Sequence, residues 1–91
     1  MDDNNDYKKA ITEIVQKQIV VLGPDIAILK AKNIEGLEVN DKGEVTGFKG
    51  NPKEILQGIV DEYISLSGLV FRNALTPILK KYPEILVNVI Q

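Results

Sequence analysis

The sequence predicts an α+β fold that is mainly α, in which two helix-turn-helix-like helical hairpins flank one β-hairpin. Three observations support this prediction. Apolar residues recur at helical spacing in residues 7–22 and again in residues 55–64. Glycine and proline interrupt these stripes. Between them lies a turn-forming segment in which apolar and polar residues alternate. We therefore expect a single small globular domain over residues 7–91, after a flexible acidic tail over residues 1–6.

The first helical hairpin is expected over residues 7–32. Its first helix has an amphipathic stripe with the i, i+3, i+4, i+7 spacing, which consists of Tyr7, Ala10, Ile11, Ile14, Val15, Ile19 and Leu22. The β-branched run at residues 19–21 also fits a short strand. Gly23 and Pro24 favour a break and a new helix. That second helix is apolar on most sides, which predicts burial between layers or at a subunit contact.

A β-hairpin is expected over residues 36–48, where apolar and polar residues alternate around a turn. Asn40 and Asp41 favour the opening of a tight turn, and Gly43 suits its positive-φ position. Because two strands alone are marginally stable in water, we expect a helix to cover them.

The second helical segment is expected over residues 52–82. Asn51 is a good N-cap and Pro52 suits the first helical position. Gly58 inside this helix is expected to mark a close helix crossing, and residues 65–68 a bend. Pro77 predicts a kink or a restart with Thr76 as the cap.

The C-terminal segment, residues 84–91, is short, apolar and rich in β-branched residues. It fits either a strand or a docked helical turn. An exposed strand edge tends to pair, so this segment either completes the sheet or adds to a partner.

The two helical segments match one another at an offset of 45 residues. This alignment pairs Ile14 with Ile59, Val15 with Val60 and Gly23 with Gly68. Any two amphipathic helices match in part by pattern alone. An internal repeat is therefore a possible interpretation, and whether it reflects a true duplication stays open.

Composition excludes several classes of chemistry. The 91 residues include no Cys, no His and no Trp. Disulfides, thiol nucleophiles, imidazole relays and Cys- or His-based metal sites are therefore excluded. The carboxylates on the helix after Pro52 form no recognisable catalytic set, and the glycines near the hairpin fit no phosphate-binding motif. We predict no enzyme activity, no cofactor and no metal.

The net charge of −2 comes from the N-terminal segment. Three of the 13 acids lie in residues 1–6, which leaves 11 bases against 10 acids in residues 7–91. A protein that depends on phosphate contacts usually has a basic face, so nucleic acid is the less favoured partner. The apolar runs are too short to span a membrane, and the acidic N-terminus is unlike a secretory signal. A cytoplasmic location is expected.

One segment resembles the turn and recognition helix of helix-turn-helix DNA-binding proteins. Ser65, Ser67 and Gly68 occupy the turn, and Arg72 and Asn73 follow at positions that read base edges in that family. The segment lacks the usual glycine in the turn before Ile64, and Leu69, Val70 and Phe71 stand where polar residues would be needed. We therefore favour the interpretation of this segment as a helix bend whose flanks pack in the core over a DNA-reading role. The resemblance implies an alternative function as a nucleic-acid-associated regulator using residues 65–73.

The leading hypothesis is a non-catalytic module for protein–protein interaction, with a homodimer or another protein as the partner. It rests on segments with apolar residues on more faces than one thin core can bury. Arg72, the only arginine, suits pairing with an acid across an interface, although a surface role is the simpler interpretation. The candidate interaction surface consists of Ile26, Leu29, Leu69, Val70, Phe71, Arg72, Leu86, Val87 and Val89.

Overall fold

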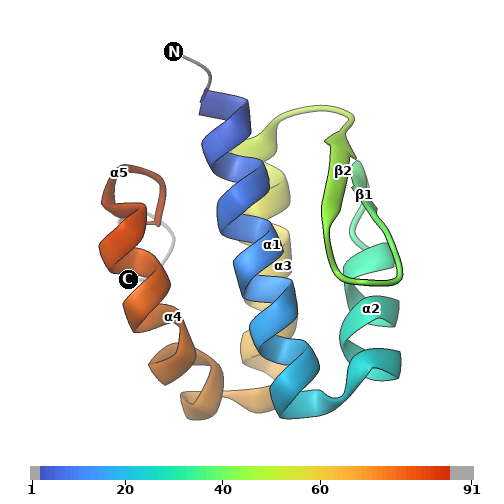
Figure 1. Cartoon of the computed structure of the whole chain (residues 1–91), viewed down its shortest axis with the longest axis vertical. Helices are drawn as coiled ribbons and strands as arrows, with labels where there is room; N and C mark the ends of the chain where they lie inside the picture. Colours follow the sequence, from blue (N-terminus) through green and yellow to red (C-terminus); the bar gives the residue numbers. More distant parts are fainter. Residues whose placement is uncertain (1–2, 87–91) are drawn as a thin grey trace.

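The computed structural model describes residues 3–86 and confirms a mainly helical α+β fold with one β-hairpin (Figure 1). The elements in chain order are α1 (Asp3–Leu22), α2 (Pro24–Lys32), β1 (Leu37–Val39), β2 (Val45–Phe48), α3 (Pro52–Ser67), α4 (Leu69–Lys81) and α5 (Pro83–Leu86). Each expected helical hairpin and the β-hairpin between them are present.

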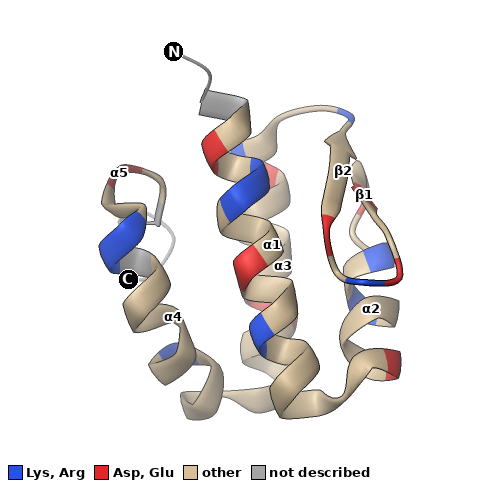
Figure 2. Ribbon diagram, in the orientation of Figure 1, with Lys and Arg blue, Asp and Glu red and all other residues tan. Residues whose placement is uncertain are grey.

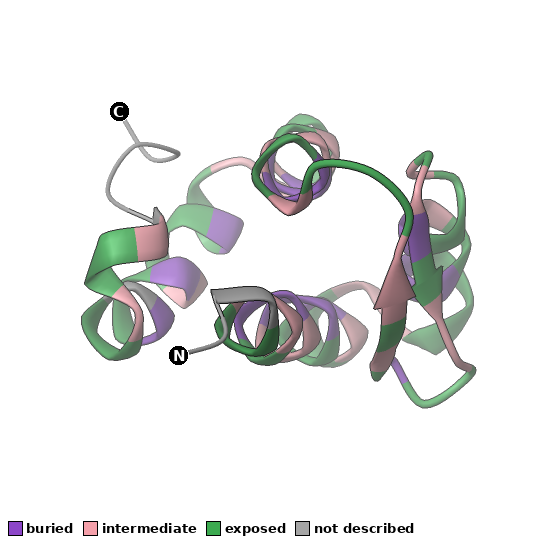
Figure 3. Cartoon of the chain, turned by 90° about the horizontal axis from the view of Figure 1, so that it is seen from above, coloured by how far each residue is buried: buried purple, intermediate pink, exposed green. Residues whose placement is uncertain are grey.

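The longest two helices, α1 and α3, lie side by side in the middle of the molecule and run in the same direction (Figure 1). Helix α2 and the β-hairpin flank this pair on one side, and α4 with α5 flanks it on the other (Figures 1 and 3). The chain therefore turns from α1 into α2, and from α3 into α4, at the same end of the molecule. We call these two turns the bends.

Helix α1 begins earlier than the sequence predicted and includes the β-branched run whose structure the sequence left open. It begins at Asp3, so the expected tail over residues 1–6 is wrong for residues 3–6. It also continues through residues 19–21, which form helix rather than a strand because Ile19 extends the apolar stripe of the preceding turns. The helix ends before Gly23, whose φ of 89° is a conformation that glycine adopts readily.

The β-hairpin is antiparallel, with Leu37 opposite Phe48. Asn40 closes the turn, because its Oδ1 accepts hydrogen bonds from the backbone N–H groups of Lys42 at 2.9 Å and Glu44 at 3.0 Å. Gly43 has the predicted positive φ, 83°. The hairpin is held against α1, since the N–H of Val45 donates to Oγ1 of Thr12 at 2.9 Å.

Helices α3 and α4 form the second helical hairpin. The N-cap of α3 is Asn51, as predicted, with its side chain accepting from the N–H of Lys53. A Cβ added at Gly58 would meet Ile34 at 3.6 Å, so this glycine faces the segment after α2 and marks no close helix crossing. Pro77 lies within a continuous α4, and the expected restart at Thr76 is wrong. The buried residues Leu75 and Ile78 anchor the helix on either side of this proline.

The core fills the space between the helices, with buried residues turned towards the centre of the molecule (Figure 3). Its largest side chains are Tyr63 of α3 and Phe71 of α4, whose rings lie 5.5 Å apart at a tilt of 56°. The Tyr63 hydroxyl donates a hydrogen bond of 2.8 Å to the carbonyl oxygen of Ala27 in α2. Tyr63 therefore connects three helices.

The internal repeat is not confirmed. Both helical hairpins bend at a glycine, but Gly23 has φ 89° and ψ 154° whereas Gly68 has φ 54° and ψ −120°. The two bends thus differ in backbone conformation. Of the predicted C-terminal segment, residues 84–86 belong to the single helical turn α5 and the rest lies outside the described residues.

Candidate interaction surface

Seven large apolar side chains are exposed on the described part of the chain. They include Val20, which is 82% exposed, Leu69 at 70% and Leu29 at 56%. We call the whole set the bend surface; it consists of Val20, Val21, Ile26, Leu29, Leu66, Leu69 and Val70.

All seven residues lie within six positions of Gly23 or Gly68. At a rise of about 1.5 Å per residue, six helical positions correspond to about 9 Å along a helix axis. Both glycines lie at the same end of the molecule (Figure 1). The exposed apolar side chains therefore gather at one end, and every other large apolar side chain whose burial the structure describes is at least partly buried.

The same end has little charge. Residues 18–24 and residues 63–71 contain no Lys, Arg, Asp or Glu. Figure 2 accordingly shows the lower ends of α1 and α3 and the bends after them without charged residues. Asp25 and Arg72 are the first charged residues after the two bends, and both are exposed. A weakly charged apolar area with a polar rim is typical of a protein-binding surface.

A buried polar contact lies just inside this end. Gln18 of α1 is fully buried, and its Oε1 accepts a hydrogen bond from Oγ of Ser67 at the end of α3, at 3.1 Å. Its Nε2 has no hydrogen-bond partner among the described residues. The contact joins the last turn of α3 to α1 close to both bends.

The structure brings together only part of the predicted interaction surface. Ile26, Leu29, Leu69, Val70 and Arg72 are exposed close to the bends. The inclusion of Phe71 is wrong, because its side chain is 1% exposed and packs against Tyr63 in the core. Leu86 is the last residue of α5, at the other end of α4 from the bends. Val87 and Val89 lie outside the described residues.

Sequence reasoning missed Val20, Val21 and Leu66. Val20 occupies a position that continues the polar face of α1 after Glu13 and Lys17, so an apolar residue there was the available signal. It lines a hollow of about 370 Å³ between α1 and α4 together with Pro77 and Ile78. The alternative interpretation of residues 19–21 as a strand obscured this signal.

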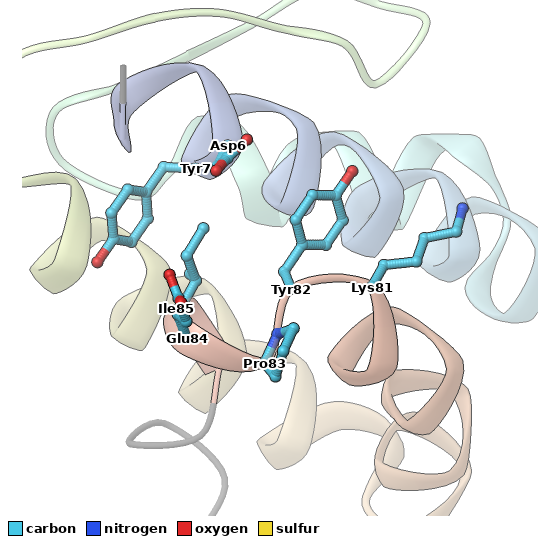
Figure 4. A pocket seen from close by; sticks show the side chains of 7 residues that line it. All are labelled: Asp6, Tyr7, Lys81, Tyr82, Pro83, Glu84 and Ile85. Atoms are coloured by element: carbon cyan, nitrogen blue, oxygen red, sulfur yellow. The ribbon is translucent and has the colours of Figure 1, made fainter. Parts of the chain in front are cut away.

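A second hollow, of about 300 Å³, lies where α5 approaches the first turns of α1. Figure 4 shows Ile85 between the rings of Tyr7 and Tyr82. The Tyr82 hydroxyl donates to Oε2 of Glu13 at 2.8 Å, and Nζ of Lys81 donates to its Oε1 at 2.9 Å.

These contacts shift the titration of two groups. Partial burial, followed by the hydrogen bond to Glu13, raises the pKa of Tyr82 to about 12. Burial alone would raise the pKa of Glu13. The net shift is nevertheless downward, to below 4.5, because two hydrogen bonds and two positive charges stabilise the ionised carboxylate. The hydrogen bonds come from Lys81 and Tyr82, and the charges are those of Lys81 and Lys17. Tyr82 therefore stays protonated and Glu13 stays ionised at neutral pH. The arrangement is an ion pair between Lys81 and Glu13 to which the Tyr82 hydroxyl adds a hydrogen bond.

Among residues 3–86, no cluster of three or more acidic side chains is placed to hold a metal ion. No helix in the same range combines the length and the apolar character needed to cross a membrane. The chain matches no protein-family model, no curated protein and no solved structure. The geometry of the bend surface therefore carries the functional argument.

Proposed function

We propose that this chain is a non-catalytic self-association module in which the bend surface of one copy packs against that of a second copy. The observation that carries the proposal is that the seven large apolar side chains found exposed all lie near the bends, at one end of the folded molecule. Burial of such side chains is favourable by about 25 cal/mol per Å² of apolar area. Exposed apolar side chains that gather in one region often mark a protein-interaction site.

The dimensions of the molecule limit the strength of this association. The principal extents are 33, 25 and 17 Å, and the bends lie at one end of the longest axis (Figure 1). An end face of 25 by 17 Å corresponds to about 400 Å² per copy, whereas stable complexes bury about 800 Å² per partner. We therefore expect a weak dimer in rapid exchange, with a dissociation constant between about 10 μM and about 1 mM.

Sedimentation velocity over a concentration series from about 10 μM to about 1 mM tests the proposal, since this range spans the expected dissociation constant. The wild-type weight-average mass should rise with concentration towards that of a dimer. Leu69→Lys places a charge in the bend surface and should hold the protein at the monomer mass. The matched control is Thr46→Lys, which adds the same charge at an exposed position of β2. A wild-type protein that stays monomeric throughout would refute self-association.

The second candidate function is the nucleic-acid-associated regulator that uses residues 65–73. It is supported by the exposure of Arg72 and Asn73 in the first turns of α4, directly after a bend. The lack of positive charge weakens this candidate, because Arg72 is the only basic residue in residues 54–79. Fluorescence anisotropy of a labelled DNA duplex at low salt distinguishes the two functions. Binding that is lost in Arg72→Ala would favour the regulator over the self-association module. The cytoplasmic location and the lack of enzyme activity stay predictions from the sequence.

A further inference from the structure

Asp25 and Arg72, one acidic and one basic, are the charged residues closest in sequence to the two bends. Asp25 lies in the first turn of α2 and Arg72 in the first turn of α4. Helices α2 and α4 flank the central pair of α1 and α3 on opposite sides (Figures 1 and 3). The two charges therefore stand on either side of the apolar residues, two and four positions beyond their bends.

Neither charge is neutralised by a salt bridge within the part of the chain that the structure describes. The four salt bridges found there join Lys30 to Glu62, Lys32 to Asp41, Lys49 to Glu38 and Lys81 to Glu13. Asp25 has a local explanation, because an acid is favoured in the first turn of a helix. Arg72 is not favoured in this way, because the positive end of the α4 dipole disfavours a cation. An acid from a second copy would be a favourable neighbour for this exposed charge.

The symmetry of a dimer decides which charges meet. In a two-fold dimer that joins the bend ends, the axis lies in the plane of contact. An axis that runs from α2 towards α4 would place Arg72 against Arg72 of the second copy and Asp25 against Asp25. An axis perpendicular to that direction, along the line of view of Figure 1, brings the start of α2 in each copy to the side where α4 of the other copy begins, and so pairs opposite charges. Like-charge juxtaposition is unfavourable, so the second arrangement is preferred.

We propose that the dimer is an end-to-end, two-fold pair in which Asp25 of each copy forms a salt bridge with Arg72 of the other. This inference rests on the proposed self-association and specifies its orientation. The apolar residues of the bend surface supply the attraction, and the two symmetric salt bridges select the orientation against the like-charged alternative.

Charge reversal tests this orientation by sedimentation velocity. Asp25→Arg alone brings two like-charged pairs into contact in the homodimer, and so does Arg72→Asp alone. Each variant should therefore dimerise about tenfold more weakly than the wild type. An equimolar mixture of the two variants should recover the wild-type affinity, because a mixed dimer restores an opposite-charge pair at both contacts. Added salt should weaken the wild-type dimer and strengthen each single-variant homodimer.

The controls are Glu35→Arg and Lys53→Asp, which change the net charge equally at exposed positions away from both bends. They should leave the dissociation constant unchanged, alone and mixed. Circular dichroism confirms that each variant is folded.

If both reversed variants dimerise as the wild type does while Leu69→Lys remains monomeric, the proposed orientation is wrong and self-association through the bend surface stands. If each reversed variant dimerises more weakly but their mixture does not recover the wild-type affinity, the Asp25–Arg72 pairing is likewise refuted. A wild type that never dimerises refutes both proposals.

Discussion

The hydroxyl of Ser67 lies 3.1 Å from Oε1 of Gln18 and 3.0 Å from the carbonyl oxygen of Tyr63, so one hydroxyl bridges the end of α3 and the buried face of α1. The two side chains are 49 positions apart in the sequence. Both residues lie within five positions of a bend, so this contact links the two helical hairpins near the bend surface.

Gln18 offers a first test, because its Nε2 is buried without a hydrogen-bond partner among residues 3–86. A buried unsatisfied donor costs about 1–3 kcal/mol. Replacement by an apolar residue of similar size removes that cost, and Ser67 keeps the Tyr63 carbonyl as an acceptor. Gln18→Leu should therefore preserve or raise the free energy of unfolding in urea. Gln18→Ala should lower it by about 2 kcal/mol, since it leaves a cavity. A large loss in Gln18→Leu would contradict this account.

Tyr63→Phe should lower the free energy of unfolding by about 1–2 kcal/mol. The substitution keeps the ring that packs against Phe71 and removes only the buried hydroxyl that donates to Ala27. Burial, then the charge of Glu62, raises the pKa of Tyr63, so the hydroxyl remains a donor at neutral pH. Tyr7→Phe is the matched control, because the Tyr7 hydroxyl has no hydrogen bond with the described residues. Equal effects of the two substitutions would show that the hydroxyl of Tyr63 contributes nothing specific.

The ion pair of Glu13 predicts a pH dependence. A carboxyl group whose pKa is lower in the folded state stabilises the fold above its unfolded pKa, and this stabilisation is lost as the pH falls through the folded pKa. Glu13 has a lowered pKa. The wild type should therefore be more stable than Glu13→Gln at pH 7, and the difference should shrink below about pH 4.5. Chemical denaturation at several pH values measures it. A difference that persists unchanged at about pH 3 would contradict the role assigned to the pair.

Pro77→Ala should raise the free energy of unfolding by about 1–3 kcal/mol. A proline inside a helix removes a backbone hydrogen bond and clashes with the preceding turn. Pro77 is exposed within a continuous helix, so alanine can restore that bond without disturbing the core. Thr76→Ala, at the adjacent exposed position, should have little effect. A lower stability of Pro77→Ala would instead show that the proline ring packs favourably beside Val20.

The fold was largely predictable because local signals agreed with the tertiary structure. The stripe that includes Ile14 and Val15, the cap at Asn51 and the turn at Gly43 each predicted an element that the structure contains. The failures have tertiary causes. Pro77 stays helical because Leu75 and Ile78 are buried on either side of it, and burial is not visible in local propensity.

The interaction surface was predictable only in part. The excess of apolar residues near the bends indicated such a surface, but the side on which each residue lies depends on helix packing. Leu69, Val70 and Phe71 are adjacent in the sequence, yet only Phe71 turns inward towards Tyr63. That both bends lie at one end follows from the parallel arrangement of α1 and α3, which no local pattern specifies.

A dilution series followed by two-dimensional ¹H–¹⁵N NMR of the wild type tests the central claim most directly, because it locates self-association on the chain. Backbone signals of residues 20–29 and 66–72 should shift with concentration, while those of the β-hairpin stay constant. Leu69→Lys should abolish the shifts. Spectra that do not change with concentration, or changes confined to the hairpin, would contradict self-association through the bend surface.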